Sequence, residues 1–109
     1  LQDLLARAQI AYRHELALAP TRELMALQAA ADARSGTARR LRTELSPEFI
    51  AGWERHRLDP AVLEALADDA RARTIALFCV EAEPTACHRS LIAARLSREL
   101  GLQIEHLRP

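Results

Sequence analysis

Apolar residues recur at helical spacing in five stretches of the chain, and residues that favour helix ends flank most of them. The spacing predicts helices over residues 1–8, 21–33, 46–55, 59–70 and 85–100. Thr21, Ser46 and Asp59 stand where an N-cap side chain is needed, and prolines follow the last two. Gly36 and Gly101 stand where two of these helices should stop.

Three other stretches have the pattern of strands. Residues 9–16 and 102–107 alternate in polarity, whereas residues 74–80, TIALFCV, form a continuous apolar run rich in strand formers. A strand, a helix and a strand in succession predict a βαβ unit with parallel strands. We therefore expect an α/β fold with a small, mainly parallel sheet of about three strands and helices packed on it.

Composition indicates one modest domain, residues 1–109, with 50% apolar and 28% charged residues. No apolar run is long enough to span a bilayer, so no membrane partner is expected, and we predict a cytoplasmic protein. Its two cysteines should be free thiols there. All 15 basic side chains are arginine, which reflects either coding bias or a need for guanidinium groups.

Reactive side chains gather between the strand at 74–80 and the helix that follows it. They are Cys79, Glu81, Cys87, His88 and Arg89. In open α/β sheets, ligands bind beyond the carboxyl ends of the strands, where this turn would lie. If the other strands are parallel, His14 and His106 reach the same edge, although both also suit ordinary strand positions.

A helix start offers unpaired N–H groups and partial positive charge, and Arg89 would clamp a phosphate or carboxylate there. The same field would lower the pKa of Cys87, which makes it the predicted nucleophile. His88 would be the acid/base and Glu81 would orient Arg89, although Arg89 equally suits a structural ion pair. Cys79 should point into the core and Cys87 outward, which leaves both thiols free.

A zinc site from Cys79, Cys87, His88 and His106 is disfavoured, because adjacent Cys and His seldom point at one ion. We expect no metal and no cofactor. Residues 34–45 lose helical periodicity and carry four arginines between positions 34 and 42. They suggest a mobile loop that is solvated or tracks a phosphate backbone. Oligomeric state is left open.

The stretch IALFCVEAEPTACHRSLIAARL, followed by IEHL, resembles the signature of the domain of unknown function 488 family. The matching positions are Cys79, Glu81, Cys87, His88, Arg89, Ile92, Ala93 and His106. The resemblance implies an α/β domain of bacteria or archaea with no established activity. Family members begin with strands that carry Gly-His-Ser and Asp-x-Arg, and neither motif is present here. With no methionine at position 1, we expect a trimmed chain covering the later two thirds of the domain.

Together these features predict a Cys/His/Arg site that binds a phosphate-like anion of a nucleotide or nucleic acid, with thiol-based catalysis. Two alternatives stay open. One is a non-catalytic nucleic-acid or anion-binding module, in which the arginine-rich loop adds contacts. The other is a thiol redox switch through Cys79 and Cys87.

Overall fold

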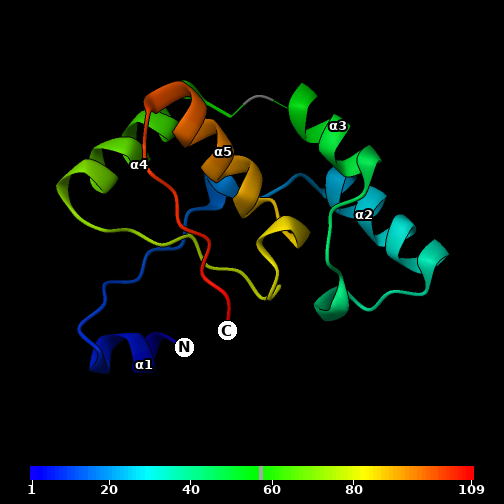
Figure 1. Ribbon diagram of the computed structural model, residues 1–109, viewed down its shortest axis with the longest axis horizontal. Helices are drawn as coiled ribbons and strands as arrows, with labels where there is room; N and C mark the ends of the chain where they lie inside the picture. Colours follow the sequence, from blue (N-terminus) through cyan, green and yellow to red (C-terminus); the bar gives the residue numbers. More distant parts are fainter. Residues whose placement is uncertain (57) are drawn as a thin grey trace.

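The computed structural model describes residues 1–56 and 58–109, and within these residues the regular secondary structure is entirely helical (Figure 1). The α-helices are α1 (Gln2–Arg7), α2 (Arg22–Ser35), α3 (Pro47–Arg55), α4 (Pro60–Ala72) and α5 (Arg89–Leu100). Three short 3₁₀ helices lie between them, η1 (Leu16–Leu18), η2 (Arg39–Leu41) and η3 (Pro84–Ala86).

Local chemistry explains where three of the helices begin and two end. Thr21, Ser46 and Asp59 each accept a backbone N–H bond on a side-chain oxygen, at 3.2, 3.1 and 2.9 Å. Gly36 and Gly101 end α2 and α5 in the left-handed conformation, with φ of 67° and 69°, which costs glycine least. The caps predicted from the sequence are confirmed.

Ser46 allows a direct test of capping, because its Oγ accepts the Phe49 N–H while its own N–H donates to Gln28 Oε1 at 2.8 Å. We expect Ser46→Ala to lower the free energy of unfolding by about 1 kcal/mol, the usual effect of a lost N-cap. Urea denaturation measures it. Ser97→Ala, on the exposed face of α5, is the control and should change little; equal losses would contradict the capping role.

The predicted α/β fold is wrong. In the described part of the chain, no strand forms in the three predicted ranges, 9–16, 74–80 and 102–107. The first range ends instead at a 3₁₀ turn that begins at Leu16. A strand exists only when a second segment supplies its hydrogen-bond partners, and no such pairing forms among residues 1–56 and 58–109. Residues 75, 77 and 79 are partly buried, whereas Phe78 and Val80 remain 73% and 55% exposed.

The predicted helix over residues 85–100 begins later, at Arg89. Before it, Pro84–Ala86 form the 3₁₀ turn η3, and Cys87 is extended, with φ −138° and ψ 146°. This irregular turn places Cys87 before the helix, so its side chain can face inward.

The core forms where α2 packs on α3 and α5 packs on α4 (Figure 1). Gly52 permits the first contact, because a Cβ there would lie 2.4 Å from Leu24 Cδ2. The buried cluster comprises Leu18, Leu24, Leu45, Phe49, Trp53, Leu58, Leu63, Leu66, Ala67, Ile92 and Leu96. Trp53 is only 1% exposed, which makes it a core residue.

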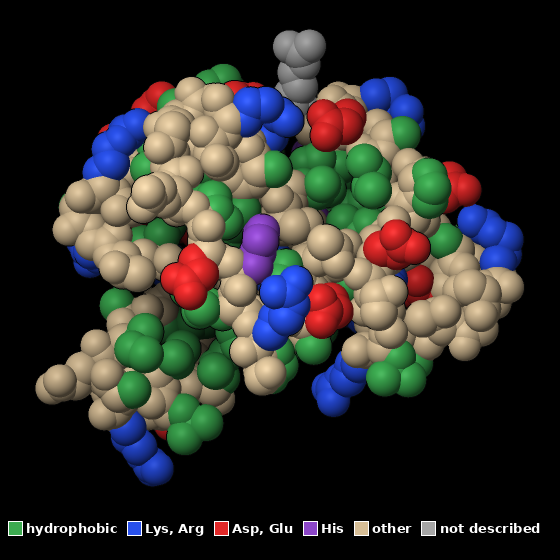
Figure 2. Space-filling model, viewed as in Figure 1, with side chains coloured by type: hydrophobic (Ala, Val, Ile, Leu, Met, Phe, Trp, Pro, Cys, Tyr) green, Lys and Arg blue, Asp and Glu red, His purple; other side chains and the backbone are tan. Residues whose placement is uncertain are grey.

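The N-terminal helix α1 lies apart and has no buried residue (Figure 1). Hydrophobic side chains show on the surface at this end of the molecule (Figure 2), and Leu4 and Ile10 are 65% and 55% exposed. Of the helices that the structure describes, none has the length and apolar character needed to cross a membrane.

Two loops meet beside the start of α5 and frame the candidate site. The Leu45 N–H donates to the Thr85 carbonyl at 3.0 Å, and Thr85 Oγ1 donates to the Thr43 carbonyl at 2.6 Å. These bonds tie the segment after η2 to the η3 turn, so arginines on η2 and its flank come close to Glu81.

Candidate functional site

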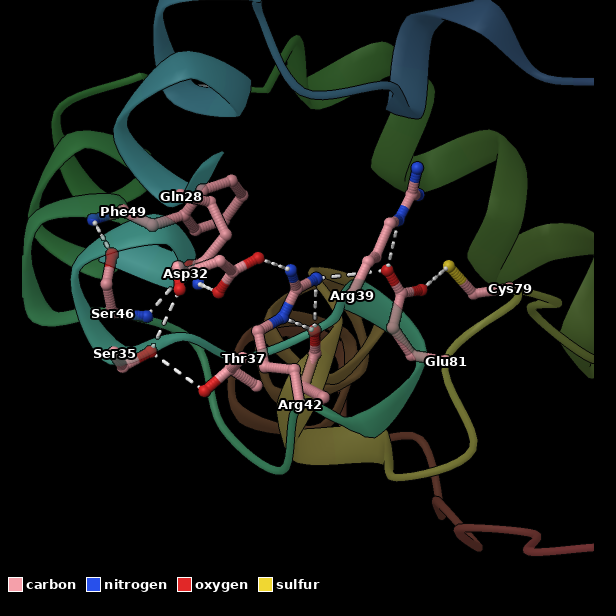
Figure 3. A network of polar contacts seen from close by, with 11 residues as sticks. Gln28, Asp32, Ser35, Thr37, Arg39, Arg42, Ser46, Phe49, Cys79 and Glu81 are labelled. Carbon is pink, nitrogen blue, oxygen red and sulfur yellow. Dashed lines mark hydrogen bonds and ion pairs between the residues drawn. The ribbon is translucent and has the colours of Figure 1, made fainter. Parts of the chain in front are cut away.

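Glu81 is the centre of the site, and its side chain is only 2% exposed (Figure 3). Its Oε1 accepts hydrogen bonds from Arg39 Nε at 2.9 Å and Arg42 Nη2 at 3.0 Å. The Cys79 thiol donates to the other oxygen, Oε2. A buried carboxylate is stable only when it is paired in this way.

Arg42 connects Glu81 to the helical core. Its side chain is 10% exposed, and Nη1 donates to Asp32 Oδ2 at 2.7 Å. Its Nε and Nη2 donate to the Ala86 carbonyl at 3.1 and 2.9 Å. Asp32 also accepts from Gln28 Nε2 at 2.9 Å. One guanidinium thus joins α2, the segment after η2 and the η3 turn (Figure 3).

The two cysteines lie on either side of this carboxylate. Sulfurs of Cys79 and Cys87 and an oxygen of Glu81 all lie within 4.8 Å of one another, and both thiols are free. Cys87 is 2% exposed, whereas Cys79 is partly exposed. The expected outward orientation of Cys87 is therefore wrong, and the Arg89 N–H donates to its Sγ at 3.4 Å. Cys79 lies on the partly buried face with residues 75 and 77, as expected, but without a covering sheet it stays partly exposed.

The thiols differ in acidity, and each one affects the pKa of the other. A hydrogen bond from Cys87 lowers the pKa of Cys79 to about 7, against the opposing effects of burial and of Glu81. The same bond and burial raise the pKa of Cys87 well above its usual range. Near neutral pH, Cys79 is therefore the thiol that ionises.

Two neighbouring groups also titrate unusually. Burial opposes ionisation of Glu81, but hydrogen bonds from Cys79 and Arg39 hold its pKa at about 2. Burial lowers the pKa of His88, so this imidazole is neutral at pH 7. Its ring packs against Trp53 with centroids 5.6 Å apart, and its Nδ1 lies 3.7 Å from Cys87 Sγ.

The turn before α5 is less open to an anion than expected. The N–H groups of Ala86 and Cys87 donate to the Glu83 and Pro84 carbonyls at 3.0 and 3.2 Å. The Arg89 N–H donates to the Cys87 sulfur, as described above. Arg89 also does not pair with Glu81; its Nη2 donates to the Ala82 carbonyl at 3.4 Å.

His14 and His106 are both exposed, and within the described residues neither forms a hydrogen bond with the cysteines or Glu81. The parallel sheet that would have brought them to this edge is absent from the same residues. Their role in anion binding stays a prediction.

The arginine-rich segment supplies residues whose role the sequence did not reveal. Arg39 and Arg42 were predicted to lie in a solvated or nucleic-acid-binding loop, but they pair with Glu81, and Arg42 also pairs with Asp32. A run of arginines does not reveal which carboxylates pair with it. Asp32 is 10 residues from Arg42 along the chain, but Glu81 is 39 to 42 residues from the two arginines.

The donor atoms of Cys79, Glu81 and Cys87 are close enough together for one metal ion to reach. However, two guanidinium groups already neutralise Oε1 of Glu81. They lower the local negative charge that attracts a cation. The arrangement suits thiol chemistry better.

Fold and site together define a small helical protein with a thiol–carboxylate–guanidinium cluster. Residues 1–96 match the family model described as Domain of unknown function DUF488, and the chain belongs to this family. The resemblance inferred from its Cys-x-Glu and Cys-His-Arg motifs is confirmed. His106 lies outside the matched residues. No curated protein and no solved structure matches the chain.

Proposed function

We propose that this protein carries a nucleophilic thiol site for an anionic substrate, with Cys79 as the attacking sulfur. The observation that carries the proposal is the pairing of a partly exposed Cys79, whose pKa is about 7, with a buried Cys87. A thiol with a pKa near ambient pH combines thiolate population with nucleophilicity. Glu81 and the arginines position this thiol.

Each neighbour has a role in the proposed reaction. The Cys79 thiolate bonds to the electrophilic atom of the substrate, and the leaving group departs with its bonding electron pair. Cys87 stabilises the thiolate by its hydrogen bond, and His88, neutral beside Cys87, serves as the base. Arg89, whose Nη2 donates within the described residues only to the neutral Ala82 carbonyl, supplies positive charge for a phosphate-like or carboxylate group.

The non-catalytic nucleic-acid-binding module has weaker support. Three of the four arginines between positions 34 and 42 already face carboxylates, with Arg34 lying 3.5 Å from Glu48. Counterion release at a phosphate backbone requires basic groups that are free to exchange partners. Free thiols are also what a reducing compartment maintains, so the cytoplasm remains the proposed location.

Alkylation kinetics test the proposal. At pH 7 we expect iodoacetamide to modify Cys79 about fivefold faster than an ordinary thiol, since the gain in thiolate exceeds the loss in intrinsic nucleophilicity. The rate should fall as pH drops through about 7. The folded protein, the same protein in urea, and Cys79→Ser are compared by mass spectrometry of the labelled peptides.

The charge of the reagent tests the anionic preference. The quantity to compare is the rate of labelling by iodoacetate divided by the rate of labelling by iodoacetamide. This ratio should be higher for the folded protein than for the chain in urea, and Arg89→Gln should lower it. Faster labelling of Cys87 than of Cys79 would overturn the assignment of the attacking sulfur. If the ratio of the two rates does not change on folding, the proposal that the substrate is anionic is contradicted.

A further inference from the structure

The two cysteines differ in access as well as in position, and this difference suggests a second chemical step. Cys79 lies in a segment without regular secondary structure and is partly exposed, whereas Cys87 is only 2% exposed. A reagent that reaches the site therefore meets Cys79 first. Any covalent adduct on Cys79 then lies beside a second sulfur, since the two sulfurs are within 4.8 Å.

From this geometry we infer that the site performs thiol–disulfide exchange, with an organic disulfide as substrate and Cys87 as the resolving thiol. The inference rests on the nucleophilic Cys79 proposed above and adds a substrate class and a second step. It needs no cofactor, because the substrate disulfide is itself the oxidant.

The exchange balances in two steps. The Cys79 thiolate attacks one sulfur of a disulfide RS–SR′, forms the mixed disulfide Cys79–S–SR and releases R′S⁻. In the mixed disulfide Cys79 carries no charge, so it no longer raises the pKa of Cys87. Cys87 then gives its proton to His88 Nδ1, 3.7 Å away, and its sulfur attacks Cys79 Sγ. The second step releases RS⁻ and leaves a Cys79–Cys87 disulfide, so the protein loses two electrons and the substrate gains them.

The surroundings favour closure of this disulfide. A bond between the sulfurs requires an approach to about 2 Å. The described residues 74–80 have no regular secondary structure to resist a small shift of Cys79. Cys87 is held in place, because its N–H donates to the Pro84 carbonyl at 3.2 Å and its carbonyl accepts from the Ser90 N–H at 3.1 Å. The movement therefore falls on the segment that carries the accessible thiol.

Glutathione disulfide is the probe, and intact-protein mass spectrometry with peptide mapping is the readout. Wild-type protein should form an internal Cys79–Cys87 disulfide, at least about tenfold faster when folded than in urea, because the fold holds the sulfurs together. Cys87→Ser should accumulate one glutathione on Cys79. Cys79→Ser should react at least about tenfold more slowly. Circular dichroism checks that each variant is folded. If Cys87→Ser disturbs the core, Cys87→Ala takes its place in the same experiment.

Wild-type protein that retains glutathione on Cys79, or that forms disulfide-linked dimers instead, would overturn the inference. If Cys79 is still alkylated as proposed above, only the exchange step fails. If Cys79 is also unreactive towards iodoacetamide, the nucleophilic site itself is refuted. Loss of both thiols at the same rate in urea and in folded protein would show that the fold does not promote the reaction.

Discussion

Replacing Arg42 with alanine is expected to lower the free energy of unfolding by about 3–5 kcal/mol, the range for breaking a buried ion pair from one side. The change removes the contacts to Asp32 and Glu81, at 2.7 and 3.0 Å, and both bonds to the Ala86 carbonyl. Of its two cationic partners, Glu81 would keep only Arg39, which is largely exposed. Urea denaturation followed by circular dichroism measures the loss.

Arg40→Ala is the matched control, because Arg40 lies in η2, two residues before Arg42, but is exposed. It should change stability by less than about 0.5 kcal/mol. Arg42→Lys should recover only part of the loss, because an ammonium group cannot reproduce the fork that reaches several acceptors. A loss below about 1 kcal/mol in Arg42→Ala would show that this guanidinium does not support the site.

The second large effect is the loss of stability in acid through Glu81. Its pKa is about 2 in the folded protein and 4.5 ordinarily, so the folded state favours the carboxylate. Its contribution is fully present above pH 4.5 and is lost as pH falls towards 2. A shift of this size corresponds to roughly 3 kcal/mol. Unfolding free energies measured between pH 6 and pH 2 should show it.

Because other carboxylates titrate in the same range, the comparison is between wild type and Glu81→Gln. The variant should be less stable at neutral pH, since the glutamine amide brings no charge to Arg39 and Arg42. Its stability should fall less steeply than that of wild type between pH 4.5 and 2. Parallel curves for the two proteins would mean that Glu81 does not titrate with a depressed pKa.

Helix ends were the part of the fold best predicted from the sequence. The caps at Thr21, Ser46 and Asp59 and the glycine stops at Gly36 and Gly101 depend on chemistry within a few residues. The strands failed for the opposite reason. Residues 74–80 have strand-forming composition, but pairing depends on a distant partner that a local pattern does not contain.

The candidate site was likewise predicted only in part from the sequence. The motif around Cys79, Glu81 and Cys87 was recognised from the sequence, and these residues do cluster. Their spacing along one short turn already limits how far apart they can lie. Which thiol is exposed did not follow, since the prediction assumed a sheet over Cys79.

By itself the sequence determined the N-caps of α2, α3 and α4, the glycine stops of α2 and α5, the family and the short segment where the thiols gather, because each depends on residues close together in the chain. Only the tertiary structure decided that Glu81 pairs with Arg39 and Arg42, that Cys87 is buried and that Cys79 carries the lowered pKa. Burial and ion pairing depend on which distant segments meet. Free energies of desolvation and of charge pairing arise only after the chain has folded.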